Sequence, residues 1–327
     1  MNNMPIHILS AQDLWTLTVL SGFDVSDDSP LKALDAWIDE FSNERAFSAS
    51  IRRLYKVNYL WKRKDGKLRV NLSILPALLV LMQPEEITLF FSLKYIQSSE
   101  NYFLKRSNTI VHYTPSLDFK IHSFSYPWDL TLMERWLENE LKLRVTKDSD
   151  VYFQLSLHPH EFLALVTIQQ ILRERYRRSG KLSLKDSSID YDDLLSAFKN
   201  TPKFIMHQEL NELADELIKK EDLIYYAIES LKEKGLMRSV SKNKFVYTDI
   251  SKELFDPGLI VDFGIAYYKS KYSRRPKEYD IIYHEDKVIL FNIERKNIRL
   301  RVLNTKRALK FLRRTVFPRV KRKVSPR

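Results

Sequence analysis

Two carboxylates and a lysine near the C-terminus have the types and spacing that could cut a phosphodiester bond. Asp280 precedes an apolar segment, residues 288–293, which runs into Glu294-Arg295-Lys296. Two carboxylates at the ends of neighbouring strands can bind Mg²⁺, and a lysine beside them can position or activate water. The pattern therefore predicts a Mg²⁺-dependent nuclease as one alternative function, with Asp280, Glu294 and Lys296 as its catalytic residues.

The same pattern has a structural interpretation, which we favour. Asp followed by Glu-x-Lys is typical of PD-(D/E)xK nucleases, but such short matches arise by chance in a chain with 29% charged residues. The strand before Glu294 also resembles the second copy of an earlier strand, and at the corresponding place in the first copy, near Ser125, no Glu-x-Lys occurs. Six glycines leave few positions for a phosphate-binding loop, and the lack of Cys excludes thiolate nucleophiles and thiolate metal sites. We therefore expect no enzymatic activity, no cofactor and no metal site.

Cations and a tryptophan gather over residues 45–69, where they could bind a partner. Nine Lys and Arg residues stand in this stretch with a single carboxylate, Asp65. A basic helix and wing can contact phosphates, so a winged-helix DNA-binding protein is a second alternative. Large aromatics beside cations dominate protein interfaces. The sequence thus predicts partner-binding residues at Trp61, Arg63 and Lys64.

The excess positive charge lies at the C-terminal end. The net charge is +12, yet 14 Lys and Arg and no acidic residue follow Glu294, which leaves the rest of the chain with 40 basic and 42 acidic groups. Such a segment attracts nucleic acid, an anionic membrane surface or an acidic protein. The predicted contact residues here are Arg313, Arg314, Arg319, Lys321, Arg322 and Lys323.

The elements that position these residues repeat along the chain. Segments 9–17 and 157–165 each begin a half with a helix, the first with Ser10 as its cap and the second with Pro159 in its first turn. A helix and a hairpin follow in both halves, and the matched positions Leu54 and Leu231 are 177 residues apart. This order is typical of a winged helix.

Strands and a closing helix complete each half. The strand content is β-branched and aromatic, and apolar stripes predict the helices over 130–141 and 308–316. The matched strands are Ile87–Phe91 with Ile260–Phe263, Ile110–Tyr113 with Asp280–Tyr283, and Phe119–Phe124 with Val288–Ile293.

Together these patterns predict an α+β protein of two quasi-symmetric repeats. Each repeat joins a winged-helix or helical bundle to an antiparallel β-sheet. The predicted boundaries are 1–147 for the first repeat, 151–316 for the second and 317–327 for a basic disordered tail.

In this order of elements the chain resembles the EspG-like chaperones of ESX (type VII) secretion. The resemblance covers nearly the whole chain, and its second half runs through Val261-Asp262-Phe263 and Tyr279–Ile293. It implies two quasi-symmetric α+β halves that keep secretion substrates, typically helical-hairpin heterodimers, soluble. No partner-contact motif matches position by position, so the resemblance assigns no binding residue. In the first half it rests on Leu9–Leu17, Glu44-Arg45-Ala46, Lys64–Val70, Leu72–Met82, Pro84 and Ile87–Phe91.

We therefore expect a non-enzymatic, protein-binding chaperone or adaptor, with a helical type VII secretion substrate as its partner. Nucleic acid remains an alternative partner, through the basic tail or the first winged helix. The segment Met1–Ser10 lacks a signal-peptide pattern, and the most apolar run, Leu75–Met82, is too short to span a bilayer. The expected location is the cytoplasm.

Overall fold

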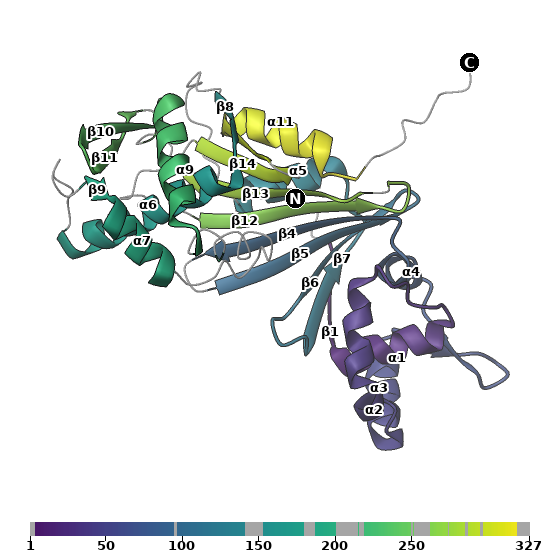
Figure 1. The fold of residues 1–327 in the computed structure, drawn as a ribbon. Helices are drawn as coiled ribbons and strands as arrows, with labels where there is room; N and C mark the ends of the chain where they lie inside the picture. The colour runs from purple at the N-terminus through teal and green to yellow at the C-terminus, as the bar shows by residue number, and fades with distance from the viewer. Residues whose placement is uncertain are drawn as a thin grey trace, which may run out of the picture. The chain divides into compact units, whose positions relative to one another are not determined.

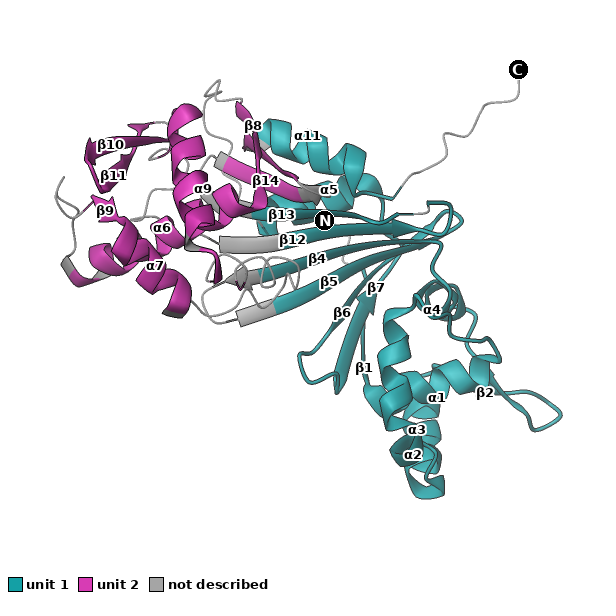
Figure 2. Cartoon of the chain, in the orientation of Figure 1, with its two compact units in different colours: residues 1–145, 262–281, 305–327 teal, residues 146–261, 282–304 magenta. Residues whose placement is uncertain are grey.

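The computed structural model describes residues 4–94, 97–140, 153–179, 187–200, 215, 219–249, 251, 262–273, 275–284, 287–294 and 297–318. The chain forms two compact units (Figure 2). Unit 1 comprises residues 1–145, 262–281 and 305–327, and unit 2 comprises residues 146–261 and 282–304. Both units combine helices with antiparallel strands, which confirms the predicted α+β class. Within the described ranges, no helix has both the length and the apolar character that a membrane crossing requires.

Unit 1 is a sheet with helices on its two faces. Its strands follow the order β1-β7-β6-β5-β4-β12-β13 (Figure 1), and the pairs from β1 to β12 are antiparallel. The elements are β1 (Ile6–Ser10), α1 (Ala11–Ser21), the 3₁₀ helix η1 (Pro30–Trp37), α2 (Ile38–Phe41), α3 (Glu44–Lys56), β2 (Leu60–Lys62), β3 (Leu68–Val70), α4 (Leu75–Met82), β4 (Glu86–Lys94), β5 (Gln97–Arg106), β6 (Thr109–Pro115), β7 (Ile121–Ser125), α5 (Leu130–Glu140), β12 (Asp262–Ser270), β13 (Lys277–His284, to residue 281) and α11 (Thr305–Thr315).

Alternation along β5 shows how this sheet is covered. Successive strand residues point to opposite faces. Leu104 belongs to the core that α1, α3 and α4 share with the sheet. Its neighbour Phe103 contacts the ring of Trp136 from α5 at a centroid distance of 5.0 Å. Phe317, where the sequence places the start of a disordered tail, is instead buried, and its ring packs edge-on against Phe90. Residues 319–327 lie outside the described chain.

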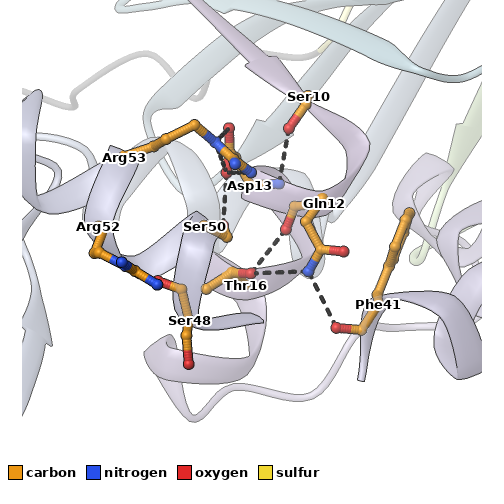
Figure 3. A network of polar contacts seen from close by, with 9 residues as sticks. All are labelled: Ser10, Gln12, Asp13, Thr16, Phe41, Ser48, Ser50, Arg52 and Arg53. Atoms are coloured by element: carbon orange, nitrogen blue, oxygen red, sulfur yellow. Dashed lines mark hydrogen bonds and ion pairs between the residues drawn. The ribbon is translucent and has the colours of Figure 1, made fainter. Parts of the chain in front are cut away.

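A buried carboxylate fastens α1 to α3 (Figure 3). As predicted, Ser10 caps α1, since its hydroxyl accepts the N–H of Asp13. The Asp13 carboxylate accepts a 2.6 Å hydrogen bond from the Ser50 hydroxyl and a 2.8 Å bond from Arg53 Nη2. Asp13, in the first turn of α1, thereby fixes the position of α3, the helix that leads to the β2–β3 hairpin.

Unit 2 contains a helical cluster and strands in two groups, in the orders β14-β15-β8 and β10-β11-β9. Helix α6 packs on α7 and α9, and the ring of Phe162 contacts Phe291 on β14 at 5.0 Å. The short strand β9 pairs with β11. The elements are β8 (Phe153–Leu157), α6 (Pro159–Ser179), β9 (Ile189–Asp190), α7 (Tyr191–Asn200), α9 (Glu221–Glu233), β10 (Met237–Ser241), β11 (Lys244–Tyr247), β14 (Lys287–Glu294) and β15 (Asn297–Asn304).

A similar clamp occurs in unit 2. Glu161, in the first turn of α6, accepts the backbone N–H of His158 at 2.7 Å. Its carboxylate also accepts the Ser230 hydroxyl and lies 2.5 Å from Lys234 Nζ. Glu161 is buried. It fastens α6 to α9 as Asp13 fastens α1 to α3.

The two hairpins share one register at the predicted offset. Leu60 pairs with Val70 on β2–β3, and Met237 pairs with Tyr247 on β10–β11. The residue that turns the chain out of the preceding helix has a left-handed backbone in both places, with φ of 60° at Asn58 and 70° at Gly235. Each hairpin is closed by the same backbone hydrogen bond, from Asn71 to Tyr59 and from Thr248 to Leu236.

The strand matching needs a correction. The first strand of each predicted copy pairs with the last strand of that copy, β1 with β7 and β8 with β15. The counterpart of β7 is therefore β15, whereas the sequence matching chose Val288–Ile293, which lies on β14. That matching omitted β5 and β15. The compact units also divide the chain differently from the predicted repeats, because β12 pairs with β4 inside unit 1. The duplication and its boundaries stay a prediction, which the matched hairpins support.

Candidate functional site

A groove in unit 1 brings exposed apolar side chains together with two arginines. It has a volume of about 280 Å³ and lies between the end of α1, the β2–β3 hairpin and the start of α4. We call it the Trp61 groove. Its lining residues are Leu20, Ser21, Phe23, Trp61, Arg63, Arg69, Val70, Leu72 and Leu75.

The β2–β3 hairpin is stabilised by the backbone and hydrogen bonding of its turn and by apolar burial at its base. Gly66 adopts φ of 84° at the turn, a backbone conformation that glycine tolerates best. The Asp65 carboxylate accepts the backbone N–H of Lys67 at 3.0 Å. At the base, Leu60 and Val70 are buried opposite each other. The hairpin that forms this wall of the groove is therefore anchored by buried residues at its base, while its turn is exposed to solvent.

The base is also tied to the sheet. The Tyr59 hydroxyl lies 2.8 Å from Nδ1 of His7 on β1. Burial lowers the pKa of His7 and raises the pKa of Tyr59, so both groups remain neutral near pH 7. A neutral pair suits this half-buried place, because an ion would lose hydration there.

The opposite wall of the groove is formed by the C-terminal end of α1 and the residues that follow it. Gly22 has φ of 73° and ends the helix, with its N–H directed to the carbonyl of Val19. The chain therefore turns sharply before Phe23. Across the groove, the Asn71 carboxamide accepts the N–H of Ser73 at 3.0 Å. That bond shapes the loop from which Leu72 projects.

Exposure distinguishes this groove from a core pocket. Leu72 is 75% exposed, Trp61 45% and Phe23 40%. Scattered apolar residues on a surface are normal, but a cluster rimmed by polar groups marks an interaction site. Large aromatics with nearby arginines are also the usual energetic centres of protein interfaces.

The electrostatics of the groove are positive. Trp61 and Arg69 are opposite each other in the hairpin ladder, so their side chains share one face. Arg63 Nη1 lies 3.9 Å from Asp65 Oδ2 at the exposed turn, a distance that gives a weak ion pair. Within the described part of the chain, Arg69 has no ion-pair partner.

The structure brings together some of the predicted binding residues. Trp61 and Arg63 line the groove, while Lys64 lies in the exposed turn beside it and is not among the lining residues. Arg313 is on α11 and forms a 3.0 Å ion pair with Glu134 of α5. Arg314 is exposed on α11. Arg319, Lys321, Arg322 and Lys323 lie outside the described residues.

Two of the three residues of the nuclease alternative lie within the described part of the chain. Asp280 is buried on β13 within unit 1, and Glu294 ends β14 in unit 2. Lys296 lies outside the described residues. Across the described ranges, no group of three or more His, Asp or Glu side chains is placed to hold a metal ion. The nuclease remains a prediction without further support.

The basic face of the DNA-binding alternative is partly engaged elsewhere. Arg53 is directed to Asp13 within unit 1, and Nε of Arg52 donates to the carbonyl of Ser48 (Figure 3). Arg53 therefore serves the packing of α3 on α1, whereas the bond of Arg52 stays within α3.

Sequence reasoning missed Phe23 and Leu72. A weak signal for Leu72 was present, because it stands alone between the polar Asn71 and Ser73. Phe23 follows a helix-ending glycine, which marks a turn but not the direction of the side chain.

No family model and no curated protein matches the chain. Among solved structures, the chain is similar to the Mycobacterium tuberculosis type VII secretion system chaperone EspG5, whose structure is a complex with a PE25-PPE41 dimer. The match has 10% identity and a TM-score of 0.46, and covers 98% of this chain and 99% of that chain.

Proposed function

We propose that this chain is a non-enzymatic chaperone or adaptor that binds a protein partner. It would cover an apolar helical patch of the partner at the Trp61 groove. The partner would be a helical secretion substrate of the type VII kind, as the sequence resemblance implies.

The observation that supports this proposal is the exposed apolar lining of the Trp61 groove. Leu72 and Trp61 expose large apolar surface to water on a hairpin that is anchored at its base. Burying such surface against a partner is favourable by about 25 cal/mol for each Å². A rigid wall loses little conformational entropy on binding, so more of that gain remains as affinity.

Co-expression tests the proposal. The chain is produced together with helical substrate pairs encoded beside its gene, and the soluble fraction of each substrate is measured with and without the chain. We expect substrate to stay soluble and to co-purify with the chain in a defined complex. Substrate that is equally soluble alone, or that never co-purifies, would contradict the proposal.

A pair of variants ties the result to the groove. Trp61→Ala removes the exposed anchor, and Lys242→Ala changes an exposed residue in the turn of the other hairpin. Co-expression with Trp61→Ala should no longer keep the substrate soluble, whereas co-expression with Lys242→Ala should keep it as soluble as the wild-type chain does. Both must show the unfolding midpoint of the wild type, so that a loss of binding is not a loss of fold.

A further inference from the structure

We infer that the Trp61 groove selects an acidic amphipathic segment and that each chain binds one such segment. This inference rests on the proposed function and specifies the partner of the same site. The segment would place one bulky apolar side chain in the groove and carboxylates beside Arg63 and Arg69.

The floor of the groove sets the apolar part of the partner. Leu20, Val70 and Leu75 line it together with Trp61 and Phe23, and Val70 is buried. A volume of about 280 Å³ accommodates a large side chain but not a folded element. The natural occupant is a single leucine, methionine or aromatic residue presented by a helix, which is how helical partners enter apolar grooves.

The rim sets the charge of the partner. The hairpin Leu60–Val70 carries five cations and only one carboxylate, Asp65. Two of the cations, Arg63 and Arg69, line the groove, and no acidic residue is among its lining residues. A guanidinium binds a carboxylate through paired N–H groups. An acidic segment is therefore attracted from a distance and oriented on arrival, whereas a basic segment is repelled.

The lining favours protein over nucleic acid. Proteins that bind single strands use rows of aromatic rings on which successive bases stack. Here Trp61 and Phe23 are the two aromatic lining residues, and the aliphatic residues Leu20, Val70, Leu72 and Leu75 outnumber them. Such a surface matches the apolar side of a helix better than the faces of bases.

Of the two hairpins that the structure describes at this offset, only β2–β3 carries the residues of the groove. At the shared offset of 177 residues, Trp61 corresponds to Arg238 and Arg69 to Val246. Val246 is buried. The β10–β11 hairpin therefore has neither the aromatic anchor nor the rim arginine that would make a second such groove.

Fluorescence anisotropy with labelled peptides tests the inference. Two helical peptides share one Leu- and Phe-containing face, and their remaining positions carry Glu in one and Lys in the other. The Glu peptide should bind at one per chain and weaken as salt is raised, and the Lys peptide should bind at least about tenfold more weakly. Equal binding of both peptides, or no binding of the Glu peptide, overturns the inference.

Variants locate the site. The double variant Arg63→Glu, Arg69→Glu should bind the Glu peptide about tenfold or more weakly and the Lys peptide more tightly than the wild type does. Lys242→Glu in the other hairpin should change the affinity for neither peptide. Trp61→Ala should weaken the Glu peptide through the lost anchor. A labelled single-stranded oligonucleotide tests nucleic acid as the alternative ligand. If it binds the wild type more tightly than the Glu peptide does, and Trp61→Ala abolishes that binding, the groove is a nucleic-acid site instead.

The two proposals can fail separately. If the wild-type chain keeps substrate soluble but the charge-reversed variant does so equally well, the proposed function stands and the acidic-segment inference is wrong. If the Glu peptide binds as described but substrates never co-purify, the groove chemistry stands and the chaperone role is wrong.

Discussion

A single buried carboxylate joins a pair of helices in each unit. Asp13 is 9% exposed and receives hydrogen bonds from Ser50 and Arg53. In unit 2, the Glu161 carboxylate accepts the Ser230 hydroxyl and pairs with Lys234 Nζ. A charge-assisted hydrogen bond in a dry place contributes more than an exposed ion pair. Both residues are therefore structural, and neither is free to bind a metal or a substrate.

Replacing Asp13 should loosen α3 from α1. In Asp13→Ala the hydroxyl of Ser50 and the guanidinium of Arg53 lose their acceptor, and we expect a loss of about 2 kcal/mol in the free energy of unfolding. Denaturant titration measures the loss. The matched control is Asp27→Ala, because the Asp27 side chain is 98% exposed and lies 4.0 Å from Lys32. A loss from the control as large as that from Asp13→Ala would contradict the assignment.

Histidines that are wholly or partly buried should make the fold sensitive to acid. Burial lowers the pKa of His112 to about 4 from 6.5, and its ring is stacked on Phe103 at 4.6 Å. The unfolded chain therefore takes up the proton first as the pH falls. The stabilising contribution is complete above about pH 6.5 and declines toward pH 4, by about 2 kcal/mol at pH 5. Burial lowers the pKa of His7 and His122 as well, which acts in the same direction.

The variant His112→Asn isolates this contribution. Its unfolding free energy should fall less than that of the wild type between pH 7.5 and pH 5, by a difference of about 2 kcal/mol. Parallel pH profiles for the two proteins would show that His112 does not titrate as a buried base.

At the scale of elements, a left-handed turn after α3 and after α9 sets the direction of each hairpin. Asn58 and Gly235 stand at these turns. Asparagine tolerates this backbone conformation better than other residues with a Cβ. No atom lies within 4 Å of a Cβ built at Gly235, so the backbone conformation and not crowding is what a side chain would disturb.

Substitutions at the two turns should differ accordingly. Gly235→Ala should cost about 1–2 kcal/mol of unfolding free energy, and Gly235→Asn should cost less. Asn58→Gly should change stability by less than about 1 kcal/mol. Thermal or denaturant unfolding of the three variants gives the comparison. An equal cost for alanine and asparagine at position 235 would contradict the conformational explanation.

The elements show how far the sequence could lead. Ser10 ahead of Asp13 predicted the start of α1, and the stripe through Met133 and Leu137 predicted α5, because both signals are local. Strand β15 was missed although Ile298, Leu300 and Val302 alternate with polar residues, since its arginines were assigned to the basic segment. Strand β5 had no such pattern: Asn101 and Lys105 are buried beside polar partners from other strands, which no local pattern reveals.

The candidate site was predictable only in part, for a related reason. Trp61 and Arg63 follow from the hairpin, whose register is local. Phe23 and Leu72 join them through tertiary packing of α1 and α4 around the hairpin, which depends on contacts between distant segments. The strand matching failed by one position because such long-range pairing also decides which strand lies beside β1 and β8.

At the scale of the whole chain, the two halves share a hairpin register and a buried carboxylate between helices, but the exposed residues of their hairpins differ. The hairpins share their register and the helices share a carboxylate clamp, so the resemblance lies in the interior. The exposed positions differ, and the first hairpin alone carries the tryptophan. Buried positions are constrained by packing, whereas exposed ones are free to acquire binding chemistry. Of the two hairpins, the first therefore carries exposed side chains that the second lacks.

Hydrogen–deuterium exchange of the chain with and without its bound substrate tests the account most directly. We predict that substrate binding slows exchange at residues 60–73, covering the β2–β3 hairpin and the loop after it, and at residues 20–25, while exchange at the β10–β11 hairpin, residues 237–247, stays unchanged. Protection confined to residues 237–247 or to other segments, with none at 60–73, would contradict the claim that the Trp61 groove is where this protein binds its partner.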